Sequence, residues 1–125
     1  MPWSASYLAD VDAVITTYAG VIPPDLLAEA VKGTMALGLE KGTSRFLADC
    51  TALEGGHSIV DLYFIGQLLE DAGISRSFRE AIVLPQLQSA AAEVRFWETT
   101  CWNRGMDVRV FKTMAEALAW LGQHR

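Results

Sequence analysis

The chain has 125 residues, of which 51% are hydrophobic and 20% are charged, and this length suits one domain over residues 1–125. Ordinary glycine and proline counts and the high apolar fraction exclude a disordered, collagenous or low-complexity protein. The formal net charge of −5 argues against nucleic acid as a partner, because nucleic-acid binders usually present a basic surface.

The cysteine content and the N-terminal residues indicate the compartment. Cys50 and Cys101 lie far apart and belong to no CxxC motif or Cys/His cluster. A secreted domain held by disulfides would carry more cysteines, so we expect a cytoplasmic protein without a metal site or cofactor. The opening MPWS lacks the features of a signal peptide. No apolar run reaches the ~18 residues of a membrane span, so any membrane contact is expected to be peripheral.

The first predicted elements are two strands. Residues 14–18 are rich in β-branched residues and stop before Gly20, which predicts a strand. Residues 5–9 are expected to pair with it in the antiparallel sense, through a turn at residues 10–12.

A helix is predicted next. Pro24 suits its first position, because the N–H that proline lacks would have no partner there. Its end is expected at Gly38 or Gly42. Helical spacing predicts one inward face, which comprises Leu27, Ala30, Val31, Thr34 and Met35.

The middle of the chain predicts a second strand and helix. The strand covers residues 44–49, and a turn is expected over residues 52–57. The helix begins at Ser58 and stops at Gly73, which fits a left-handed cap. Its predicted inward residues are Ile59, Leu62, Tyr63, Leu69 and Ala72.

Two further strand–helix units complete the chain. The apolar run at residues 81–84 is typical of a central strand, and Pro85 closes it. A helix to about Arg104 follows, and residues 106–111 alternate as an edge strand would. A capping box of Thr113 and Glu116 opens the last helix. The inward residues predicted on these two helices are Leu87, Ala90, Val94, Trp97 and Cys101, then Ala117, Leu118 and Leu121.

The resulting order is ββαβαβαβα. Such alternation predicts an α/β sandwich: a mostly parallel sheet of four to five strands, with right-handed crossovers and helices packed on it.

This pattern resembles the SpoIIAA-like family, a branch of the STAS fold. The resemblance spans nearly the whole chain and rests on three local features. These are FLADCT at residues 46–51, the helix that begins at Ser58, and MDVRVF at 106–111 running into EALAWL at 116–121. It implies a small bacterial cytoplasmic domain of largely unassigned function. Its relatives are anti-sigma-factor antagonists and lipid-exchange domains that hold an apolar ligand.

Ser58 is a phosphorylation candidate through this resemblance. In the antagonists a serine at the start of this helix is phosphorylated within Asp-Ser-Ser-Gly, and an ungapped count places Ser58 on it. The flanking His57, Ile59 and Val60 depart from that motif. From the residues alone, Ser58 also fits a helix N-cap completed by Asp61. A phosphoswitch at Ser58 is therefore the alternative function.

Asp49 and His57 are candidate ligand-binding residues, because they follow a strand at the edge where open α/β sheets bind ligands. A single histidine on a loop is more often a surface residue, and Asp49 is expected to accept backbone N–H bonds in its turn. A third hypothesis is that the protein is a small hydrolase that uses Asp49, His57 and Ser58. Since His57 and Ser58 are adjacent and would need an unusual turn, we expect no catalytic residue and no enzyme.

The two middle helices carry more apolar residues than a sheet-facing stripe of ~100° can absorb. Phe64 should therefore point away from the sheet, and Phe96 and Trp102 fall off the inward stripe of the next helix. We expect the two helices to lie side by side, with Phe64 and Phe96 flanking a groove. Packing between neighbouring helices is the other interpretation of these rings.

Taken together, these patterns predict a SpoIIAA-like binding or regulatory domain. We expect a homodimer whose apolar helix surface holds a protein partner or an apolar, lipid-like small molecule.

Overall fold

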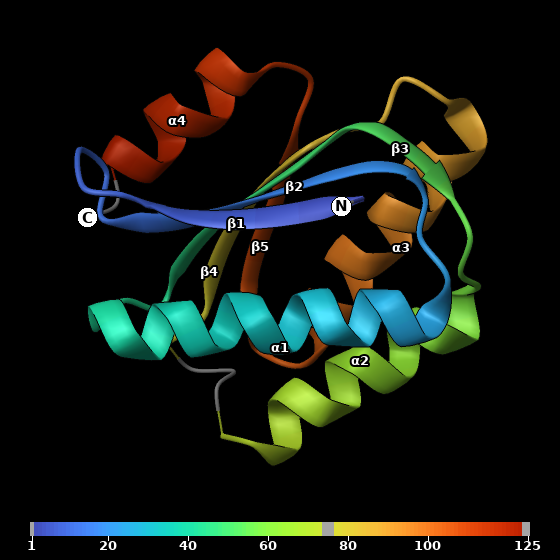
Figure 1. The fold of residues 1–125 in the computed structure, drawn as a ribbon, viewed down its shortest axis with the longest axis horizontal. Coiled ribbons are helices and arrows are strands. Elements are labelled where there is room, and N and C mark those ends of the chain that lie inside the picture. The colour runs from blue at the N-terminus through green and yellow to red at the C-terminus, as the bar shows by residue number, and fades with distance from the viewer. Residues whose placement is uncertain (1, 74–76, 124–125) are drawn as a thin grey trace.

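In the computed structural model, which describes residues 2–73 and 77–123, five strands form one sheet in the order β1-β2-β3-β4-β5 (Figure 1). Their bounds are Trp3–Leu8, Ala13–Val21, Arg45–Gly55, Arg79–Val83 and Asp107–Phe111. β1 pairs with β2 in the antiparallel sense, and the other neighbours pair in parallel. The predicted element order, the mostly parallel sheet and the edge position of β5 are confirmed.

Four helices cover the two faces of this sheet. They are α1 (Pro24–Lys41), α2 (Ile59–Asp71), α3 (Gln88–Asn103) and α4 (Met114–Gln123). α1, α2 and α3 lie on one face, and α4 lies alone on the other (Figure 1). Because side chains alternate along a strand, Phe46 and Ala48 enter the larger core under the three helices, whereas Leu47 enters the smaller core under α4.

The strand β3 is longer than the sequence predicts. It runs to Gly55, so the turn predicted over residues 52–57 is wrong in its first four residues. Thr17 pairs with Asp49 but Ala19 pairs with Ala52, so β3 carries an extra residue there. Such a bulge shifts the alternation, and Leu53 becomes buried while Ala52 is exposed.

The ends of α1 and α4 follow the predicted chemistry. α1 has proline at its start and ends at Gly42, whose φ of +68° is left-handed. Gly38, the other expected end, lies inside the helix, where a Cβ would come within 2.9 Å of the Phe46 ring. The hydroxyl of Thr113 accepts the backbone N–H of Glu116 before α4, as its capping box requires.

The inward face predicted for α2 is partly wrong. Leu62 and Leu69 are buried, but Ile59 and Tyr63 are about half exposed, and Ala72 is exposed. The helix packs mainly against α3 and not flat on the sheet. It therefore buries only a narrow stripe. Leu87, predicted inward on the next helix, is also exposed, because it caps the N-terminus of α3.

Candidate functional site

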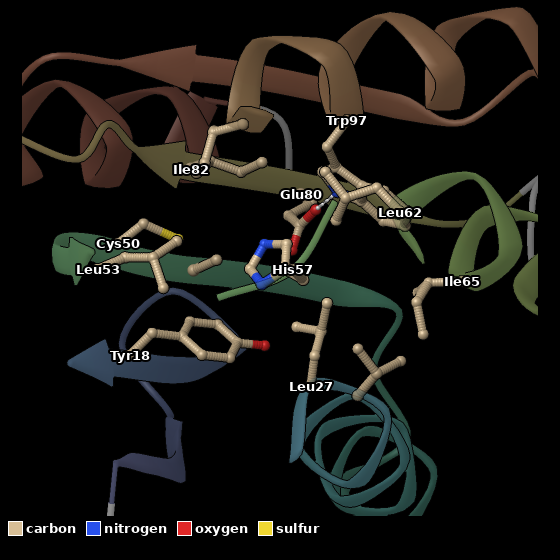
Figure 2. A pocket seen from close by; sticks show the side chains of 13 residues that line it. Tyr18, Leu27, Cys50, Leu53, His57, Leu62, Ile65, Glu80, Ile82 and Trp97 are labelled. Atoms are coloured by element: carbon tan, nitrogen blue, oxygen red, sulfur yellow. Dashed lines mark hydrogen bonds between the residues drawn. The ribbon is translucent and has the colours of Figure 1, made fainter. Parts of the chain in front are cut away.

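A cavity of about 80 Å³ lies between the sheet and the three helices on its larger-core side (Figure 2). The helices α1, α2 and α3 line it with aliphatic side chains and Trp97. The strands add further apolar side chains, among them Leu53, which the bulge turns inward. Tyr18, Cys50, His57 and Glu80 bring polar atoms to the wall. The site is thus an apolar chamber with a few convergent polar groups.

Glu80 is the acidic residue of this wall. It stands on β4 two residues before Ile82, so both side chains project from the same face of the strand. The indole Nε1 of Trp97 donates a hydrogen bond of 2.9 Å to Glu80 Oε1. Burial raises the pKa of Glu80 to about 7, against the opposing effect of that bond. The neutral form of the carboxyl group is therefore favoured more strongly than in a fully exposed glutamate.

Tyr18 on β2 faces Glu80 across the cavity wall. Its side chain is 9% exposed, and its hydroxyl points inward in Figure 2. Within residues 2–73 and 77–123, no hydrogen bond to this hydroxyl is found. Burial raises the pKa of Tyr18 well above its usual value, so the group stays a neutral phenol. It is available to hydrogen-bond a ligand.

Cys50 contributes a thiol to the same wall. Burial raises the pKa of the Cys50 thiol above its usual value. Because the thiolate is the nucleophilic form of cysteine, this side chain behaves as a small apolar group.

His57 is buried, contrary to the expectation of a surface residue. It is 8% exposed, and its Nδ1 lies 3.0 Å from the carbonyl oxygen of Ile22. Its Nε2 lies 3.7 Å from Glu93 Oε2 on α3. The backbone N–H of Ile22 donates in turn to Gly55, which draws the loop after β3 against the end of β2. These contacts pull the imidazole inward, where it lines the cavity.

Asp49 accepts a backbone N–H, as expected, but it does so within β3 and not in a turn. It does not line the cavity, so its part in ligand binding stays a prediction. Its Oδ1 accepts the backbone N–H of Thr51 at 3.1 Å and the Thr51 hydroxyl at 2.6 Å, beside the bulge in β3. The carboxylate supplies a partner for an N–H where the ladder is disturbed.

Ser58 caps α2 and is exposed. Its hydroxyl accepts the backbone N–H of Asp61 at 3.2 Å, and the Asp61 carboxylate accepts the Ser58 N–H at 2.7 Å. This reciprocal pair is the capping box predicted from sequence. Asp49, His57 and Ser58 each contact a different partner, and the absence of a catalytic role for them stays a prediction.

The three predicted aromatic candidates lie in different settings. α2 and α3 are neighbours, as expected, and Phe64 is 64% exposed on the outer side of α2. Phe96 is partly buried against the larger core. Trp102 is half exposed, and its indole N–H donates to the carbonyl oxygen of Val108 at 2.7 Å. None of the three lines the cavity, and their part in partner binding stays a prediction.

Phe64 belongs to an apolar surface on α2 that the sequence pattern predicts only in part. Five large apolar side chains of this helix are between 47% and 64% exposed, namely Ile59, Val60, Tyr63, Phe64 and Leu68. We call these five residues the α2 patch. Exposed apolar patches of this kind mark interaction surfaces.

In the part of the chain that the structure describes, no three His, Cys, Asp or Glu side chains are grouped so that they could hold a metal ion. None of the helices there has the length and apolarity needed to cross a bilayer.

The fold is similar to that of a solved structure. An uncharacterized protein of the DUF3478 family from Shewanella loihica PV-4, described as having a SpoIIAA-like fold, superposes with a TM-score of 0.62. The match covers 95% of this chain and 91% of that one, at 19% sequence identity. No protein-family model and no curated protein matches the sequence. The resemblance stated from sequence is thus confirmed at the level of architecture: this chain has the SpoIIAA-like fold.

Proposed function

We propose that this protein is a non-enzymatic binding domain that holds a small, largely apolar ligand in the cavity beside Glu80. The observation that supports this most is the chamber itself. Apolar side chains from three helices and the sheet surround it, and Tyr18 and Glu80 direct polar atoms into it. A concave apolar site with a few placed polar groups is the usual form of a small-molecule site.

The volume limits the ligand. A cavity of roughly 150 Å³ holds benzene, with six heavy atoms. By that measure, a cavity of about 80 Å³ takes roughly three to four heavy atoms. The ligand is then either very small, or an extended apolar molecule of which one end enters the cavity while the rest lies outside it.

A cavity-filling variant tests this proposal. Ala48→Leu adds volume to the wall, whereas Ala52→Leu makes the same change at an exposed position on the same strand. Native mass spectrometry should show retained ligand on the wild type and on Ala52→Leu, and much less on Ala48→Leu. NMR titration with propan-1-ol, which has four heavy atoms, should shift the resonances of wall residues in the same order. A wild-type protein that carries no adduct and shows no shift would contradict the proposal.

A phosphoswitch at Ser58 is the second candidate function. The hydroxyl is exposed at the N-terminus of α2, where the partial positive charge of the helix end favours a phosphate. The Asp61 carboxylate, 3.0 Å from that hydroxyl, would repel it. Incubation with cell lysate and ATP, followed by peptide mapping, tests this function by the presence of phosphate on Ser58.

A further inference from the structure

The acid in the cavity wall has no cation beside it. In the part of the chain that the structure describes, the Glu80 side chain forms no ion pair, and its one hydrogen bond comes from the neutral indole of Trp97. An ionised carboxylate removed from water is costly unless a positive group or several donors face it. The cavity wall thus carries an acidic group that no positive group among the described residues pairs with.

Two aromatic residues accompany this carboxyl group. Tyr18 from β2 and Trp97 from α3 approach from opposite sides of the chamber, with Glu80 and His57 between them in the view of Figure 2. Aromatic rings attract organic cations through their negative faces, and tryptophan and tyrosine do so best. The Tyr18 hydroxyl oxygen can also accept one N–H.

We propose that the cavity receives the ammonium end of a small alkylamine, with the Glu80 carboxylate as its counter-ion and the Tyr18 hydroxyl as a second acceptor. This inference rests on the proposed function, and it names the class of ligand. An ammonium nitrogen with two or three carbons has the size that the chamber accommodates. The net charge of −5 favours the approach of a cation.

The protonation state of Glu80 supports the choice of a cation. Burial raises its pKa to about 7, which marks a carboxylate lacking a compensating charge. An ammonium ion would restore the charged form, so binding requires Glu80 to be ionised. The other titratable groups of this wall are Tyr18, Cys50 and His57. Burial keeps the Tyr18 phenol and the Cys50 thiol neutral in this range. Variants of Glu80 and of His57 then show which of the two side chains the binding depends on.

The direct test is titration with three probes of equal length: propan-1-amine, propan-1-ol and propanoic acid. NMR titration of the wild type should give the tightest binding for the amine. Glu80→Gln keeps an acceptor for the Trp97 indole but removes the charge, and it should weaken amine binding at least tenfold. Glu54→Gln, on an exposed position of β3 outside the cavity, is the matched control and should leave binding unchanged.

The pH dependence supplies a second readout. With a Glu80 pKa of about 7, amine affinity of the wild type should rise roughly tenfold between about pH 6 and pH 8. His57→Gln should retain this rise, whereas Glu80→Gln should lose it. Tyr18→Phe, which removes only a hydroxyl, should lower the affinity for the amine several-fold. This variant tests the proposal even if Glu80→Gln does not fold.

The outcomes separate the two proposals. If the alcohol or the acid binds and the amine does not, the inference about the amine is overturned while the binding function stands. If amine affinity is the same in Glu80→Gln as in the wild type, the assigned counter-ion is wrong. If none of the three probes binds to the wild type, the binding function fails as well.

Discussion

The imidazole Nδ1 of His57 lies 3.0 Å from the carbonyl oxygen of Ile22, although the two residues are 35 positions apart. The backbone N–H of the same Ile22 donates to the carbonyl oxygen of Gly55 at 2.8 Å. Together these bonds fix the loop from which α2 starts against the end of β2. The position of the helix that covers the cavity is therefore set from its N-terminal end.

This junction depends on Gly56. Its φ is +108°, and a Cβ there would lie 2.7 Å from backbone atoms of Ile22. Gly55 has a similar φ of +106° but no atom within 4 Å of its Cβ position. We expect Gly55→Ala to lower the free energy of unfolding by about 1–3 kcal/mol through backbone strain alone, and Gly56→Ala to lower it further. Urea denaturation measures both, and equal losses would mean that the contact with Ile22 is not tight.

The capping box of α2 gives a second prediction. Ser58→Ala should lower the free energy of unfolding by about 1 kcal/mol, because it removes the acceptor for a backbone N–H. Ser89→Ala, at an exposed position in the first turn of α3, is the control and should cost about 0.5 kcal/mol or less. Urea denaturation near neutral pH compares them. A loss as small as that of the control would show that the cap contributes nothing.

The cap should also weaken in acid. Hydrogen bonds from Ser58 hold the pKa of the Asp61 carboxyl below its usual value. The contribution of Asp61 is therefore present above its unfolded pKa and is lost as pH falls through its lower, folded pKa. Asp61→Asn should destabilise the protein near neutral pH, and the difference from the wild type should shrink at low pH. A difference independent of pH would contradict this assignment.

The architecture was predictable because local signals agree with the global fold. Pro24, Ser58 and Thr113 mark helix starts by chemistry that needs no distant partner, and all three lie where the structure begins a helix. The alternating residues of the last strand indicate an edge, since one of its faces is polar. A fold can be predicted from its sequence when the local preferences of each segment agree with the global fold.

The site was not predictable in the same way. The strand predicted at residues 81–84 left out Glu80, because a charged residue breaks the apolar run, although the structure places it in β4 and partly buries it. Trp97, which encloses it, is 17 residues away. The available signal was the shared face of Glu80 and Ile82. Burial of His57 likewise depends on Ile22, and the inward turn of Leu53 depends on a bulge that the sequence does not mark.

We expect the α2 patch to be the interface of the homodimer that the sequence predicts. Phe64→Asp places a charge at its most exposed ring and should convert a dimer into a monomer in sedimentation analysis. The cost in the free energy of unfolding should be about 0.5 kcal/mol or less, because Phe64 is 64% exposed. Leu39→Asp, at an exposed position on α1, is the matched control and should leave the mass unchanged. Equal masses for Phe64→Asp and the wild type would remove the patch as the interface.

Phe96 calls for a different expectation from Phe64. It is partly buried against the larger core, so Phe96→Asp should destabilise the fold by roughly 2 kcal/mol or more, through the loss of apolar packing and the burial of a charge. Urea denaturation would show this directly. A stability equal to that of Phe64→Asp would place the ring outside the core.

Glu80 should also make stability depend on pH without any ligand. Its pKa is raised from 4.5 to about 7 in the folded protein, so between these values the folded state holds a proton that the unfolded state has released. The stability that this proton provides is present below about pH 4.5 and is lost as pH rises through about 7. The loss is at most about 3–4 kcal/mol, since each pKa unit corresponds to about 1.36 kcal/mol. Glu80→Gln should remove this pH-dependent loss. In urea denaturation, the free energy of unfolding of the variant should therefore rise relative to that of the wild type between about pH 4.5 and pH 8. Glu54→Gln should show no such gain, and a wild type that tracks Glu80→Gln across this range would mean that the carboxyl group is well solvated.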